Sequence, residues 1–102
     1  MTPGERIVEA RQTAEELAEV IRAEGRDGLV WQQRVRQVAA DLSAPGATDT
    51  ERLAVARERF GSLYAGGRNF ADFHIWRTGE AERIAANERL SELVRRLREL
   101  LV

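Results

Sequence analysis

Apolar residues recur at helical spacing in four separate stretches of this 102-residue chain, and turn-forming residues stand between the stretches. In residues 3–24 and 27–42, apolar positions follow one another three or four residues apart, which places them on one face of a helix. The same spacing returns in residues 49–64 and again from residue 80 to the end of the chain. The sequence therefore predicts an all-α fold with four helices.

The ends of the first two predicted helices carry the expected capping chemistry. Thr2 and Glu5 have the spacing of a capping box, Gly25 is expected to end the first helix, and Asp27 is expected to cap the second. Helices joined by so short a link are antiparallel neighbours. We therefore expect a small four-helix bundle of two antiparallel hairpins, formed by one domain that covers residues 1–102.

Composition excludes several classes of function. The chain has 16 basic and 17 acidic residues, so the basic surplus of a nucleic-acid binder is missing and nucleic acid is not the expected partner. It has no cysteine and one histidine, and we therefore expect no metal site and no cofactor. No apolar run approaches the about 18 residues of a membrane span, and no signal-peptide pattern is present. We expect a cytoplasmic protein that does not enter a membrane.

Residues 64–79, called the aromatic segment below, differ in composition from the rest of the chain. They hold the only histidine and four of the six aromatic residues. These four are Tyr64, Phe70, Phe73 and Trp76. At least one of Gly66 and Gly67 is expected to have a positive φ angle, because glycine adopts that conformation without strain.

Two conformations are open for residues 69–76. A short helix capped by Asn69 would bring three aromatic residues to one face at i,i+3 spacing. This face would consist of Phe70, Phe73 and Trp76. An extended chain would instead place His74 and Ile75 on opposite sides. The capping chemistry of Asn69, with Asp72 at the third position of the turn, favours the short helix.

The same segment resembles a small uncharacterised bacterial family, a domain of unknown function. That family has a helical hairpin with an early tryptophan in its second helix, then the motif F-G-G-M-G-S-F-N-D-L, then a closing helix with N-x-x-L-x-x-L. The positions that match or correspond are Trp31, Tyr64, Gly66, Asn69, Phe70, Asp72, Asn87, Leu90 and Leu93. The positions that depart from the motif are Ala65, Gly67, Arg68 and Ala71. The family has no known activity, so the resemblance supports only the architecture and the importance of the loop.

Two catalytic or ligand-binding interpretations of the aromatic segment compete with simpler ones. Asp72 near His74 could orient an imidazole for acid–base chemistry, but a helix-capping aspartate and an exposed loop histidine are the simpler interpretation. Gly66 and Gly67 with Arg68 could hold a phosphate, but Asp72 in the following turn would repel an anion, which favours a simple tight turn.

The preferred functional hypothesis is a non-enzymatic helical protein-interaction module of unknown biological role, such as an immunity- or antitoxin-like inhibitor. Its partner would be another protein, or a second copy of the chain, bound through the last helix or through the 68–77 loop. The candidate binding residues are Arg68, Asn69, Asp72, His74, Trp76 and Arg77. The alternative is a small-ligand-binding protein or minor enzyme with a polar site built from Arg68, Asp72, His74 and Arg77.

Four residues are expected to be structural. Trp31 leads the apolar stripe of the second helix and is expected in the core, while Gly66 and Gly67 are expected to shape the loop. Asn87 lies on the apolar stripe of the last helix, where an unpaired amide would cost about 1–3 kcal/mol. We therefore expect its side chain to bond to backbone within residues 64–72.

Overall fold

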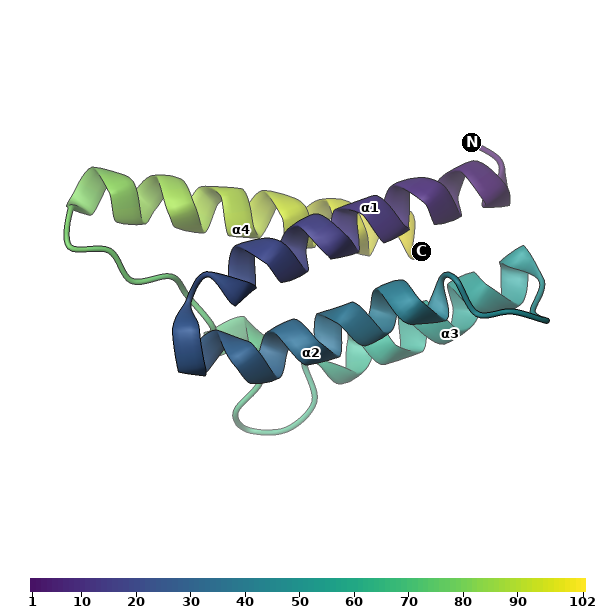
Figure 1. Ribbon diagram of the computed structural model, residues 1–102, viewed down its shortest axis with the longest axis horizontal. Coiled ribbons are helices and arrows are strands. Elements are labelled where there is room, and N and C mark those ends of the chain that lie inside the picture. Colours follow the sequence, from purple (N-terminus) through teal and green to yellow (C-terminus); the bar gives the residue numbers. More distant parts are fainter.

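The computed structural model describes all residues, 1–102, and contains four α-helices, one 3-10 turn and no strand. The elements are α1 (Pro3–Arg22), α2 (Gly25–Asp41), α3 (Asp49–Ser62), the 3-10 turn η1 (Phe70–Asp72) and α4 (Glu80–Leu100). Figure 1 shows α1 and α4 in one half of the molecule and α2 and α3 in the other. The predicted all-α four-helix bundle is confirmed.

Helix α1 is the centre of the bundle because it packs against each of the other three helices. It runs antiparallel to α2 and to α4, and α2 runs antiparallel to α3 (Figure 1). Helices α3 and α4 approach each other mainly through side chains. Arg98 of α4 lies over the rings of Phe60 and Tyr64, with its guanidinium carbon 5.7 and 5.1 Å from their centroids.

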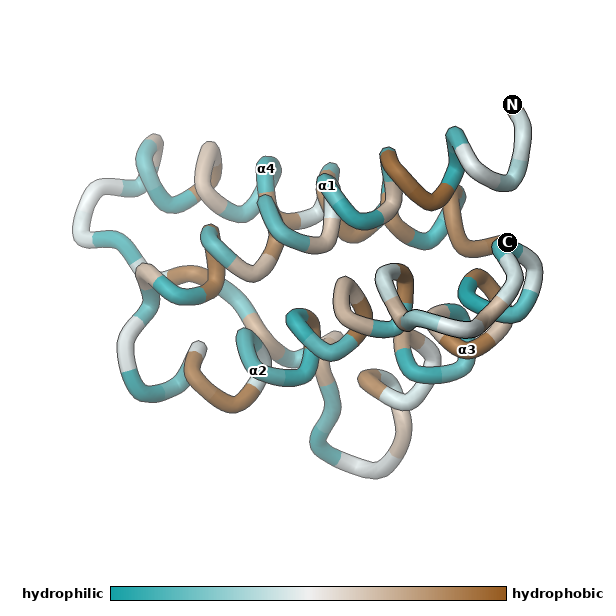
Figure 2. The backbone as a smooth tube through the Cα atoms, turned by 45° about the vertical axis from the view of Figure 1, so that its right-hand side comes forward, coloured by the Kyte–Doolittle hydropathy of each residue, from teal (hydrophilic) through white to brown (hydrophobic).

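The core is formed by the apolar faces that the helical spacing predicted. Hydrophobic and polar residues alternate in short blocks along each helix (Figure 2), as expected for helices with one buried face. In α1 the buried positions are Ile7, Ala10, Thr13, Ala14, Leu17, Ala18 and Ile21. In α4 they are Leu90, Leu93, Leu97 and Leu100.

The junction between α1 and α2 differs from the prediction at two positions. Helix α1 ends at Arg22 and α2 already begins at Gly25, whose φ angle of 69° reverses the chain. Asp27 therefore lies inside the first turn of α2, and the prediction that it caps this helix is wrong. Glu24 occupies the capping position without a side-chain hydrogen bond to the helix. By contrast, the capping box of Thr2 and Glu5 on α1 is confirmed.

The aromatic segment combines the two conformations that the sequence left open. Asn69 caps the 3-10 turn η1 by accepting a hydrogen bond from the Ala71 amide at 2.9 Å, and the carboxylate of Asp72 accepts one from the Asn69 amide at 3.3 Å. The chain is extended from Phe73 onward. Of the two glycines before this turn, only Gly66 has a positive φ, at 88°.

Candidate functional site

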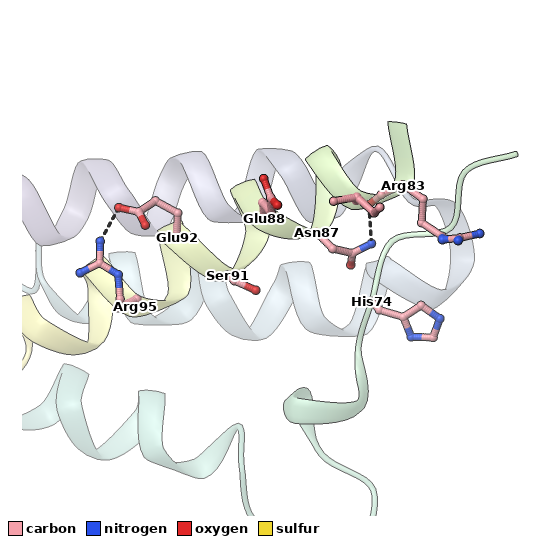
Figure 3. Close-up of a pocket in the computed structure, with 8 residues that line it drawn as sticks. His74, Arg83, Asn87, Glu88, Ser91, Glu92 and Arg95 are labelled. Carbon is pink, nitrogen blue, oxygen red and sulfur yellow. Dashed lines mark hydrogen bonds and ion pairs between the residues drawn. The ribbon is translucent and has the colours of Figure 1, made fainter. Parts of the chain in front are cut away.

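The side chain of Asn87 holds the extended part of the aromatic segment against α4. Its Oδ1 accepts a hydrogen bond from the amide of Ile75 at 2.8 Å, and its Nδ2 donates to the carbonyl of the same residue at 2.8 Å. Nδ2 also donates to the carbonyl of Arg83, one helical turn earlier, at 2.8 Å (Figure 3). Asn87 thus bonds to the backbone of the segment as expected, but at Ile75 rather than within residues 64–72. The reason is that the extended chain carries Ile75, not the glycine turn, past this point of α4.

A second anchor fixes the segment two residues further on. The guanidinium of Arg77 donates to both carboxylate oxygens of Glu24 at 2.6 and 2.8 Å, and only 11% of the Glu24 side chain is exposed. The nearby carboxylate raises the pKa of Arg77 above its ordinary value, because it favours the charged guanidinium. This two-pronged pair ties the segment to the corner between α1 and α2, across 53 positions of sequence.

Trp76 stands between these two anchors and projects from the surface. It is 68% exposed, although Ile75 before it is buried. The guanidinium carbon of Arg83 lies 5.4 Å from the centroid of its ring, within the range of a cation–π contact. The backbone that carries this large exposed ring is therefore held at the preceding and following residues.

Four of the six candidate binding residues line one hollow of about 470 Å³. They are Arg68, Asn69, Asp72 and His74. The other lining residues are Asp27, Trp31 and Phe73, and we call this site the Trp31 hollow. Trp76 and Arg77 lie outside it, so the polar site of the alternative hypothesis includes only three of its four residues.

The pair of Asp72 and His74 does not have the geometry of a catalytic dyad. The Nδ1 atom of His74 lies 3.4 Å from the backbone carbonyl of Asp72, not from its carboxylate. That carboxylate accepts the Asn69 amide in the capping box instead. Asp72 therefore fulfils the structural role that was the simpler interpretation of the sequence.

Trp31 is half-buried at the edge of the core rather than inside it. Its ring centroid lies 5.4 Å from that of Phe70, and Arg34 covers it with its guanidinium carbon 5.2 Å from the centroid. The tryptophan packs against the core and also lines the hollow. Trp31 therefore packs against the core with one part of its ring, and the other part faces the hollow rather than the core interior.

A second hollow, of about 660 Å³, lies along α4 and reaches the extended segment at His74 (Figure 3). It is lined by His74, Arg83, Ile84, Asn87, Glu88, Ser91, Glu92 and Arg95. We call it the α4 hollow. Ile84, the one large apolar residue in this lining, is 50% exposed. In Figure 1 the first turns of α4 extend past the end of α1.

Sequence reasoning missed Glu24 and Arg83 as members of this region. Neither stands in a recognisable motif, and each acquires its role through a contact that the local pattern does not contain. Glu24 meets a residue 53 positions away, and Arg83 meets Trp76 only because the segment folds back along α4. Nothing in the sequence distinguishes Glu24 and Arg83 from the other charged residues of the chain.

No group of three or more His, Cys, Asp or Glu side chains is arranged to hold a metal ion. None of the helices combines the length and the apolar character that crossing a membrane requires. Comparison with known protein families, with curated proteins and with solved structures finds no match to this chain. The resemblance to the uncharacterised bacterial family therefore stays a prediction.

Proposed function

We propose that this chain is a non-enzymatic protein-interaction module that docks a partner protein on the surface around Trp76. The observation that carries the proposal is a tryptophan that is 68% exposed on a backbone held at both neighbouring residues. Exposed aromatic rings and arginines are the residue types that most often dominate binding energy at protein interfaces. Trp76 with Arg83 over its ring combines both types at one point.

The two anchors support the proposal because they lower the entropic cost of binding. A partner that covers a mobile loop must first order it, and this ordering reduces the affinity. Here Asn87 has already bonded the backbone of Ile75 before Trp76, and the side chain of Arg77 after it is already paired with Glu24. The free energy gained when the partner buries the ring is then not reduced by the cost of ordering the segment.

The same geometry gives less support to a small-ligand site or minor enzyme. That alternative needs Arg68, Asp72, His74 and Arg77 to act together. The carboxylate of Asp72 is engaged by the Asn69 amide, and Arg77 is paired with Glu24.

An inhibitor of the immunity or antitoxin type is a role that such a module fits. The absence of cysteine suits a reducing compartment, so the proposal places the module in a bacterial cytoplasm.

A photo-crosslinking amino acid at position 76 tests the proposal in cells of the source organism. We expect illumination to give a discrete higher-mass product with the probe at position 76. The matched control is the same probe at Val55 in α3, which is 48% exposed and lies away from the aromatic segment; it should give no such product. No product from position 76, or equal products from both positions, would contradict the proposal.

Trp76→Ala then measures how much the ring contributes to binding of the trapped partner. Because the ring is mostly exposed, its loss should change the free energy of unfolding by no more than about 0.5 kcal/mol. Loss of an interface anchor costs about 2 kcal/mol or more, so the affinity should fall by roughly 30-fold. Thermal melting and titration calorimetry of the two proteins give the two values.

A further inference from the structure

The backbone of the extended residues leaves one edge without hydrogen bonds. The amides of Phe73 and Ile75 are bonded, to the Phe70 carbonyl and to Asn87 respectively. The amides of His74 and Trp76 have no partner within the chain, and the Trp76 carbonyl accepts only from the neighbouring Arg77 side chain. A carbonyl oxygen has two lone pairs, so this one can still accept a second hydrogen bond.

These unpaired groups point to the side opposite α4. In an extended chain, the N–H and C=O of one residue lie on one edge and those of its two neighbours lie on the other. Ile75 directs both of its groups at Asn87 on α4. Those of His74 and Trp76 therefore point away from α4.

His74 lines both hollows. The α4 hollow is on the bonded side, because α4 supplies most of its lining. The Trp31 hollow is lined from α2 and from the loop and includes no residue of α4. A strand of three residues is about 10 Å long, which is the length of edge that residues 74–76 present.

We propose that an extended peptide segment of the partner adds as a strand to the free edge of His74 and Trp76 and extends past His74 into the Trp31 hollow. This inference rests on the proposed docking function and names the form of the partner. A helix cannot fill this role because its own backbone groups are bonded internally. An extended peptide has free groups at every second residue and pairs with an exposed edge.

The lining of the hollow indicates which side chains the peptide carries. Trp31 and Phe73 supply an apolar wall against which one aliphatic or aromatic side chain packs. Arg68 and Asp27 are exposed and have no ion-pair partner within the chain, so they offer one contact for an acidic and one for a basic side chain. The partner segment is therefore an extended peptide with a central apolar residue flanked by charges of both signs.

Two variants of one residue separate backbone pairing from side-chain contact. His74→Pro removes the amide hydrogen, whereas His74→Ala keeps it and removes only the imidazole. The residue before it meets the requirement for proline, because Phe73 has φ −73° and ψ 129°, the extended conformation that a residue before proline adopts. Thermal melting should confirm that both variants fold.

The probe is a phage-displayed library of random linear peptides, enriched against the purified wild-type chain. We expect enriched peptides still to bind His74→Ala, and this variant, which lacks only the imidazole, is the reference against which His74→Pro is compared. Binding to His74→Pro should fall by about tenfold or more. The proline cannot donate a hydrogen bond to the peptide's carbonyl, and its ring pushes that carbonyl away; together these losses cost more than about 1.4 kcal/mol. In the wild type, a bound peptide should also slow hydrogen exchange at the amides of His74 and Trp76.

Other outcomes overturn strand addition. These are a library that enriches nothing, peptides that bind helically, and peptides that bind His74→Pro as tightly as the wild type. Peptides that require Trp76 but tolerate His74→Pro would leave the proposed docking surface in place and reject only the strand pairing. Peptides indifferent to Trp76→Ala would count against the docking surface itself.

Discussion

Replacement of Gly28 by alanine is expected to lower the free energy of unfolding by about 3 kcal/mol, although alanine is the better helix former. Gly28 is buried in the first turn of α2, against the last turn of α1. A β-carbon there would lie 2.3 Å from the carbonyl oxygen of Ile21 and 3.2 Å from its Cγ2 atom. The oxygen belongs to the backbone of a buried turn, so the two helices must move apart to make room. For a domain of this size the melting temperature should fall by roughly 12–24 °C.

Gly61→Ala is the matched control for this prediction. Gly61 lies in α3, is exposed, and a β-carbon there would meet no atom within 4 Å. Alanine should therefore stabilise the protein by about 0.5–1 kcal/mol through its helix propensity alone. Chemical denaturation of both variants measures the two effects. A Gly28→Ala variant as stable as Gly61→Ala would show that the α1–α2 packing is not as close as described.

Asn87→Leu is expected to lower the free energy of unfolding by about 3 kcal/mol as well. The change keeps nearly the same size but removes both hydrogen bonds to the backbone of Ile75. Each unpaired group next to buried surface costs about 1–3 kcal/mol, and Ile75 itself is buried at 1% exposure. The loss should be local: the amide of Ile75, which donates to Asn87, should exchange faster, while those in the middle of α2 should not.

Ser91→Leu provides the comparison for this substitution. Ser91 lies one turn further along the same side of α4, is exposed, and makes no side-chain hydrogen bond within the chain. The same replacement with leucine should change the stability by no more than about 0.5 kcal/mol. Unchanged exchange at Ile75 in Asn87→Leu would mean that Asn87 does not hold the segment.

The helices could be predicted from the sequence because each carries a complete local signal. A single buried face repeats with the helical period, and turn residues such as Gly25 interrupt it. The start of α2 was placed two residues late because Asp27 has the chemistry of a cap, whereas the positive φ of Gly25 lets the helix start directly after the reversal. A capping residue is preferred but not required, and only the path of the chain decides whether one is used.

The candidate site could be predicted only in part, because its geometry depends on the register between segments. Composition alone singled out residues 64–79, and the polar Asn87 on an apolar stripe indicated a structural hydrogen bond. The partner of Asn87 is Ile75 because the extended chain passes α4 at that residue. No local sequence pattern contains this information. The ion pair of Glu24 with Arg77 escaped prediction for the same reason.

The central place of α1 has a consequence for the order in which the protein folds. The α1–α2 hairpin brings together residues that are near neighbours in sequence, and such contacts form early because little chain must be closed. The contacts between α1 and α4 instead join the two ends of the chain, as in the hydrogen bond from Arg6 to the carbonyl of Val102 across 96 positions. Docking of α4 is therefore expected to be the late step of folding. The surface around Trp76 is likewise completed by a long-range contact, since Arg77 reaches Glu24 across 53 positions of sequence.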